Sequence, residues 1–157
     1  NPPPKALTRL PNINIAYRMY NKKLSQSSGV NANEFITKKL TNEYPSEYNI
    51  ITKNKFPYYL DPQILHLVLW INPLYESDAK NTEQAIRGEI AAKLDNKNAD
   101  FVLYENLPKH RSISTVRHYQ LFVLCSVGKN DKIDKNDKND KNDKKEIENK
   151  LLLKPMF

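Results

Sequence analysis

The chain has 157 residues, a length typical of one domain, and its formal net charge is +7. Its single cysteine, Cys125, excludes an intramolecular disulfide, so the core must be stable without cross-links. The longest apolar run, residues 64–71, is much shorter than the roughly 20 residues of a membrane-spanning helix. Composition therefore predicts a protein that does not insert into membranes.

The positive charge lies mainly outside the Lys/Asp-rich segment 129–150. That segment holds eight Lys against seven Asp and Glu, so +6 of the net charge belongs to the rest of the chain. Such an excess suits nucleic acid, anionic lipid or phosphorylated small molecules as partners, although it is also common on surfaces that only keep a protein in solution. The lone cysteine favours a cytoplasmic location. The Lys/Asn/Ile bias is typical of AT-rich genomes, such as those of protists and their viruses.

The N-terminal third predicts helices joined by proline-rich segments. Residues 1–12 should be extended, because proline disfavours helix interiors. Residues 15–24 predict a short helix with Ile15, Met19 and Tyr20 on one side. A second helix is expected over 34–40, with Asn33 as its N-cap. The Tyr/Pro-rich segment 43–62 is expected to connect elements and pack over a sheet without forming a strand.

Residues 64–71 give the clearest strand signal in the chain. The run is almost entirely apolar, which is typical of a central strand covered on both faces. Alternation places His66, Val68 and Trp70 on one face of the strand and the four residues Leu65, Leu67, Leu69 and Ile71 on the other.

The second half predicts a helix over 77–94, with Ser77, Asn81 and Thr82 as alternative N-caps. Strands are expected over 101–105 and 114–127. The fold class predicted is α+β, with a three- to four-stranded, largely antiparallel sheet and packed helices in a single domain over residues 13–128.

The C-terminal region is expected to contribute little to the core. Segment 129–150 alternates opposite charges with no apolar anchor in its Lys-Asn-Asp repeat, and this composition predicts disorder because nothing in the repeat offsets the entropy of ordering. Residues 151–157 are apolar again and are predicted to return as the fourth strand, at an edge of the sheet.

Motifs for several chemistries are absent from the sequence. The three glycines form neither a dinucleotide-binding nor a P-loop pattern, and no nucleophile-elbow motif occurs. One cysteine and three histidines cannot form a cysteine-rich zinc site. The sequence therefore predicts no metal and no cofactor, and it leaves open whether the protein is an enzyme.

Polar residues lie on or beside the best predicted strands and converge if those strands are neighbours. His118 is the candidate catalytic residue, because imidazole titrates near neutral pH. Arg111, with Ser112 and Asn106 beside it, could hold a phosphate or carboxylate. The candidate ligand-binding residues are Asn106, Arg111, Ser112, Gln120, His66, Trp70 and Asn72. A simpler interpretation of these residues is a hydrogen-bond network that fixes the sheet.

Three sequence blocks resemble the N-acetylglucosamine-induced protein family of fungi, which has relatives in protists and large viruses. They read LHLVLWINP at 65–73, ENLPKHRSI at 105–113 and HYQLFV at 118–123. Arg117 stands where that family usually has Trp, and Gln120 stands where it has a second His. The resemblance implies candidate site residues but no reaction.

Two functional hypotheses follow. In the first, the chain binds or processes a phosphorylated small molecule, either a sugar phosphate or a nucleotide, at the His/Arg/Asn cluster. In the second, it is a non-catalytic module that binds protein or nucleic acid through a basic, tyrosine-rich surface, since Tyr is common at interfaces. The sequence leaves the oligomeric state open.

Overall fold

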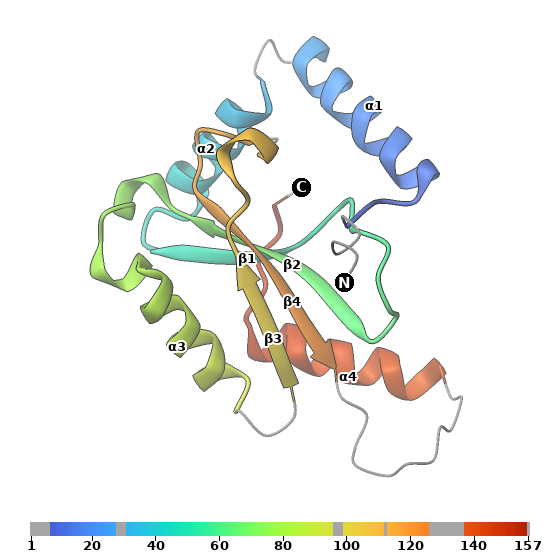
Figure 1. Ribbon diagram of the computed structural model, residues 1–157. Helices are drawn as coiled ribbons and strands as arrows, with labels where there is room; N and C mark the ends of the chain where they lie inside the picture. The colour runs from blue at the N-terminus through green and yellow to red at the C-terminus, as the bar shows by residue number, and fades with distance from the viewer. Residues whose placement is uncertain (1–6, 28–30, 96–98, 112, 126–136, 157) are drawn as a thin grey trace, which may run out of the picture.

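The computed structural model describes residues 7–27, 31–95, 99–111, 113–125 and 137–156. These residues form an α+β fold in which one antiparallel sheet lies between helices (Figure 1). The predicted single-domain α+β class is confirmed. Within these residues, no helix combines the length and apolar character needed to cross a membrane.

The sheet has four strands in the order β1-β2-β4-β3. They are β1 (Asn49–Lys53), β2 (Ile64–Ile71), β3 (Ala99–Tyr104) and β4 (His118–Cys125). β2 pairs with β1 on one side and with β4 on the other, which confirms its predicted central position. Trp70 lies opposite His118, so these two side chains share one face of the sheet.

The first face of the sheet carries an apolar core. Helices α3 (Glu83–Lys93) and α4 (Asp137–Lys150) pack against it. Thr82 caps α3, one of the three caps that the sequence offered. The core includes Leu67, Leu69, Ile71, Ile86, Ile90, Leu121, Val123 and Ile147, all buried.

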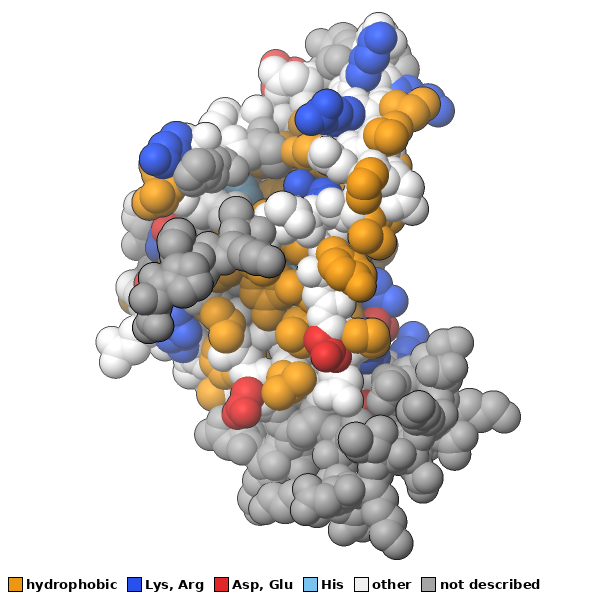
Figure 2. Space-filling model, turned by 45° about the vertical axis from the view of Figure 1, so that its right-hand side comes forward, with side chains coloured by type: hydrophobic (Ala, Val, Ile, Leu, Met, Phe, Trp, Pro, Cys, Tyr) orange, Lys and Arg blue, Asp and Glu red, His pale blue; other side chains and the backbone are white. Residues whose placement is uncertain are grey.

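The second face is covered by α2 (Ala32–Glu43) and, at a greater distance, by α1 (Pro11–Ser27). Ile36 and Leu40 of α2 pack against Val68 and Trp70. Hydrophobic side chains remain visible across the middle of the face in Figure 2.

Three short 3₁₀ helices lie in the connections between elements. They are η1 (Pro73–Tyr75), η2 (Ala79–Asn81) and η3 (Pro108–His110). The Asn72 side chain caps η1 by accepting a hydrogen bond from the backbone N–H of Leu74. The sharp end of β2 is therefore encoded by the Asn-Pro pair that follows it.

The N-terminal half differs from the sequence prediction in three places. β1 lies inside the segment predicted to contain no strand. It forms because its pairing with β2 buries Ile50 and Ile51 on opposite faces of the sheet. α1 begins at Pro11, since proline is tolerated in a first helical turn. The N-cap of α2 is Asn31, whereas the carboxamide oxygen of Asn33 accepts hydrogen bonds from the loop before β4.

Part of the segment predicted to be disordered forms helix α4. Its last turns are anchored by Ile147 and Leu151, which are one turn apart and both buried in the first core. Lys53 of β1 also pairs with Glu148 at 2.9 Å. Two apolar residues near its end thus fix a helix whose other residues are almost all charged or Asn. Residues 129–136 of the predicted disordered segment lie outside the described residues.

Residues 151–156 form a turn and an extended segment rather than the predicted edge strand. The backbone N–H of Lys154 donates to the carbonyl of Ile51, so the segment runs along the edge of β1. Leu151 belongs to the first core and Met156 to the core of the second face. The fourth strand of the sheet is therefore β1, and the C-terminal segment covers its outer edge.

Candidate functional site

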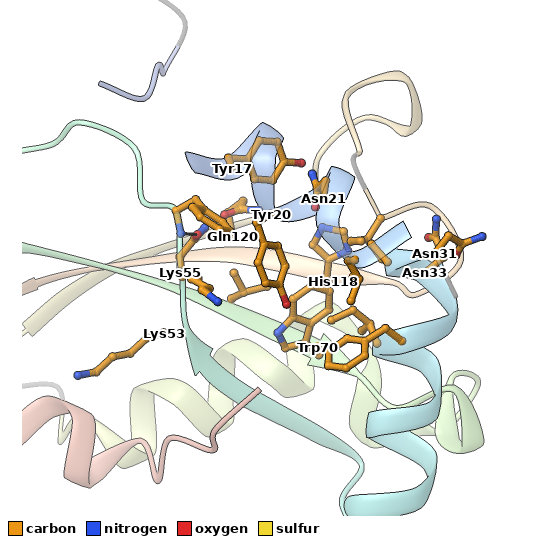
Figure 3. A pocket seen from close by; sticks show the side chains of 18 of the residues that line it. Tyr17, Tyr20, Asn21, Asn31, Asn33, Lys53, Lys55, Trp70, His118 and Gln120 are labelled. Carbon is orange, nitrogen blue, oxygen red and sulfur yellow. Dashed lines mark hydrogen bonds between the residues drawn. The ribbon is translucent and has the colours of Figure 1, made fainter. Parts of the chain in front are cut away.

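A pocket of about 330 Å³ lies between α1, α2 and the second face of the sheet (Figure 3). Ligand sites in proteins typically have volumes of about 300–1,000 Å³, so this pocket suits a small molecule. Its floor is formed by Val68 and Trp70 of β2 with His118 and Gln120 of β4. The walls come from α1, the start of α2 and the segment that follows β1.

His118 presents one ring nitrogen to the pocket. Nδ1 lies 2.9 Å from the carbonyl oxygen of Val116 and must donate to it, so the hydrogen of the neutral ring is on Nδ1. Nε2 has no hydrogen-bond partner among the described residues. Every fully buried side-chain nitrogen or oxygen in the described part of the chain has such a partner, so Nε2 must remain accessible.

The environment keeps the His118 ring neutral. Burial is the largest influence and lowers its pKa, and the Arg111 charge acts in the same direction; the Val116 hydrogen bond and Glu105 oppose them. The ring also packs against Trp70, with ring centroids 4.9 Å apart. A neutral imidazole with a free Nε2 lone pair can accept a proton or a hydrogen bond from a ligand.

His66 lies behind the floor and orients Gln120. The backbone N–H of Tyr58 donates to Nδ1 of His66 at 3.2 Å, so the ring hydrogen is on Nε2. Nε2 then donates to Oε1 of Gln120 at 2.6 Å. The amide nitrogen of Asn54 also lies 3.1 Å from Nε2, but it cannot donate to a nitrogen that already carries hydrogen.

The same arrangement leaves the amide NH₂ of Gln120 facing the pocket. This nitrogen has no partner in the described part of the chain, and unpartnered buried nitrogens do not occur there, so it is accessible. His66 stacks on Phe122 with ring centroids 4.5 Å apart. Burial lowers the pKa of His66 to about 4, and the Gln120 hydrogen bond only partly opposes this effect.

The pocket lining is positively charged. Its described residues include Arg9, Lys53 and Lys55 but no Asp or Glu. Lys53 is neutralised by its ion pair with Glu148 on α4. Lys55 lies over the ring of Tyr20, with its ammonium 4.1 Å from the ring centroid. The described lining residues thus carry more positive than negative charge, which favours an anionic ligand.

Two of the predicted ligand-binding residues make structural contacts. Trp70 lines the floor, and its indole N–H donates to the hydroxyl of Thr52 at 2.9 Å. Asn72 is completely buried, and its amide donates to the carbonyls of Leu40, Tyr44 and Glu47. Asn72 therefore ties α2 and the following turn to the end of β2, away from the pocket.

The predicted loop group lies apart from the pocket lining. Arg111 pairs with Glu105 at 3.2 Å, and its Nε donates to the backbone carbonyl of Asn106. Arg117 pairs with the same carboxylate. Ser112 lies outside the described residues. The structure thus brings together His66, Trp70, His118 and Gln120, while Arg111 and Asn106 belong to a neighbouring ion-pair network.

The roof of the pocket was missed by the sequence analysis. Tyr17, Tyr20 and Asn21 of α1 line it, and Figure 3 shows Tyr20 extending from α1 toward Trp70 and His118. Of the three residues that the sequence placed on one side of this helix, Tyr20 lines the pocket, whereas Ile15 and Met19 are 59% and 66% exposed. The spacing of Tyr17, Tyr20, Asn21 and Leu24 was the available signal, since these residues share one helix face.

The α2 side of the pocket combines asparagines with the apolar residues Ala32, Phe35 and Ile36. Asn31 and Asn33 both lie there, at the first residues of the helix. Nowhere in the described ranges do three or more His, Cys, Asp or Glu side chains lie close enough together to hold a metal ion. The pocket therefore offers carboxamides, aromatic rings, cations and one free imidazole nitrogen.

The fold and pocket define a small α+β protein with a basic pocket that contains histidine. The chain belongs to the family described as "Protein of unknown function (DUF3605)", whose model matches residues 4–124. This description does not confirm the N-acetylglucosamine-induced family name.

The fold resembles a solved crystal structure of HTC1, with a TM-score of 0.56 and 18% identity over 90% of this chain and 85% of that chain. At this identity the likeness shows the fold alone. No curated protein matches the sequence.

Proposed function

We propose that the protein binds a small phosphorylated molecule, a nucleotide or a sugar phosphate, in the pocket between α1, α2 and the sheet. The main support is the charge of the lining, whose described residues include Arg9, Lys53 and Lys55 but no Asp or Glu. Phosphate groups prefer such sites because charge-assisted hydrogen bonds to Arg and Lys are stronger than neutral ones. The resemblance noted in the sequence adds amino-sugar phosphates to the candidates.

His118 is the residue through which the pocket could act on its ligand. Its Nε2 is accessible, lies on the floor and is unprotonated in the neutral ring. It can therefore serve as a general base toward a ligand hydroxyl or water. Gln120 cannot replace a second histidine in proton transfer, because a carboxamide does not titrate. Any turnover thus depends on a single imidazole.

The proposal is tested by titration calorimetry of the intact chain with nucleoside monophosphates, hexose phosphates and amino-sugar phosphates. At least one should bind, and Arg9→Ala and Lys55→Ala should each weaken binding by about tenfold or more, the loss expected for one charged hydrogen bond. Lys23→Ala is the matched control, because Lys23 is exposed on α1 and does not line the pocket. The proposal fails if no phosphorylated compound binds.

A second candidate function is a non-catalytic module for nucleic acid. A groove between β1, α4 and the C-terminal segment is lined by four lysines, with Glu148 as its one carboxylate among the described residues. The lysines are Lys53, Lys55, Lys145 and Lys154. Binding of RNA or DNA there should weaken steeply as salt rises, because counterions are released on binding. A binding constant that does not change with salt contradicts this alternative.

A further inference from the structure

We infer that the ligand of the pocket is a mononucleotide and that Gln120 and His118 recognise its base. This inference rests on the proposed function and narrows it from phosphorylated small molecules to one class. Its basis is that the pocket floor offers one hydrogen-bond donor and one hydrogen-bond acceptor, and that neighbouring residues fix which is which.

The first fixed point is the amide of Gln120. A glutamine amide can normally turn over and offer either its oxygen or its NH₂. Here Oε1 is taken by Nε2–H of His66 at 2.6 Å. His66 is itself held by the backbone N–H of Tyr58 and by stacking on Tyr58 and Phe122. Gln120 therefore offers a donor to the pocket and cannot offer an acceptor.

The second fixed point is Nε2 of His118, two residues earlier on the same face of β4. Its Nδ1–H donates to Val116, so the neutral ring offers an acceptor to the pocket. A fixed donor and a fixed acceptor thus lie side by side on the floor. Sugar hydroxyls rotate and can satisfy either point, so this polarity cannot distinguish among them. The edges of nucleobases carry donors and acceptors at fixed positions, which such a floor can discriminate.

The remaining lining fits the other parts of a nucleotide. Trp70 on the floor and Tyr20 on the roof provide flat faces on which a base can stack (Figure 3). The Tyr20 ring contacts Phe56, with centroids 5.5 Å apart, and the ammonium of Lys55 lies over it. Arg9 lies over the rings of Tyr17 and Tyr58. Both cations therefore lie beside aromatic rings of the lining, where they can bind the phosphate. The volume of about 330 Å³ suits one mononucleotide rather than a larger cofactor.

The experiment compares ligands that differ only in the base. Titration calorimetry at neutral pH with the four ribonucleoside 5′-monophosphates and ribose 5-phosphate should show one nucleotide binding about tenfold or more tightly than ribose 5-phosphate. If ribose 5-phosphate or a hexose phosphate binds as tightly as the best nucleotide, the inference is overturned while the proposed function stands. If no phosphorylated compound binds, both fail.

Gln120→Glu tests the role of the floor directly. A carboxylate still accepts the His66 hydrogen bond but removes the donor from the pocket. The ratio of affinities for the best nucleotide and for ribose 5-phosphate should fall toward one, because only the nucleotide loses a hydrogen bond to the floor. The added charge weakens both ligands alike and does not change the ratio. Gln63→Glu is the control, since Gln63 is exposed, does not line the pocket and undergoes the same change of charge.

An unchanged affinity ratio in Gln120→Glu overturns the inference. Should this variant fail to fold, the wild-type comparison of nucleotides with ribose 5-phosphate still decides it.

Discussion

The two faces of the sheet are built from the same strands but have different characters. On the first face, Leu67 and Leu121 pack with α3 and α4 in a core that consists of apolar side chains and Tyr119. On the second face, His66, His118 and Gln120 are buried beside a pocket. The residues of β2 and β4 alternate between these two environments along each strand.

This comparison shows how a small protein can separate stability from chemistry. Side chains that are adjacent in sequence point to opposite faces of a strand, so the apolar core and the pocket share one backbone. Polar residues on the second face are stabilised by hydrogen bonds to one another, as Trp70 is to Thr52. Substitutions on the two faces should therefore have different effects, and four measurements can test this.

The largest effect is expected from Leu121→Ala on the first face. Leu121 is fully buried, and its truncation leaves a cavity that α3 and the neighbouring strands cannot fill. The free energy of unfolding should fall by about 2–5 kcal/mol in urea denaturation. Val102→Ala, at a 59% exposed position of β3, is the control and should change it by less than about 0.5 kcal/mol. Similar losses in both variants would show that the first face is not a close-packed core.

Asn72→Ala should destabilise the protein by about 1–3 kcal/mol without changing ligand affinity in the folded protein. The substitution removes a buried amide that donates to the carbonyls of Leu40, Tyr44 and Glu47. Denaturation and calorimetry of the same variant give the two readouts. A normal stability combined with weaker ligand binding would instead support the predicted ligand-binding role of Asn72.

The buried His66 should make stability depend on pH. In the unfolded chain a histidine takes up a proton below about pH 6.5, whereas folded His66 does so only near pH 4. The unfolded state therefore binds more protons in this window, and stability falls as the pH falls. His66 should contribute a loss of about 2 kcal/mol between about pH 7.5 and pH 5.

Urea denaturation of the wild type and of His66→Gln at both pH values isolates this contribution. The variant lacks the titrating group and should lose correspondingly less stability on acidification. Equal losses would mean that His66 is already solvated in the folded protein.

The smallest effect is expected from Glu148→Gln on α4. This change removes the ion pair with Lys53, whose side chain is 63% exposed, so the loss should be about 0.2–1 kcal/mol and should shrink in high salt. Glu146→Gln, which removes a pair within α4 itself, serves for comparison. A loss above that range would indicate that the attachment of α4 depends on charge rather than on Ile147 and Leu151.

The central part of the fold and of the site could be predicted from the sequence. The apolar run of β2 required a strand covered on both faces, and its period of two placed His66 with Trp70. The same period placed His118 with Gln120 on β4. These predictions needed only local pattern, because the side-chain direction in a strand follows from residue number.

The other parts depend on tertiary contacts that local pattern does not contain. β1 has only five residues in a Tyr/Pro-rich segment, and its pairing with β2 defines it. The inner face of α1 is defined by the pocket it covers. Arg111 looked like a free anion ligand because its partner Glu105 is six residues away in a loop whose shape the sequence did not reveal.

The C-terminal segment has a consequence for how the chain folds during synthesis. Leu151 completes the core on one side of the sheet, and Met156, five residues later, completes the core on the other. Neither core is complete until these residues have left the ribosome, although the four strands of the described sheet are made earlier. Until Lys154 is also made, the outer edge of β1 lacks its hydrogen bond from the C-terminal segment and is an open strand edge, the kind of surface that can pair with other chains.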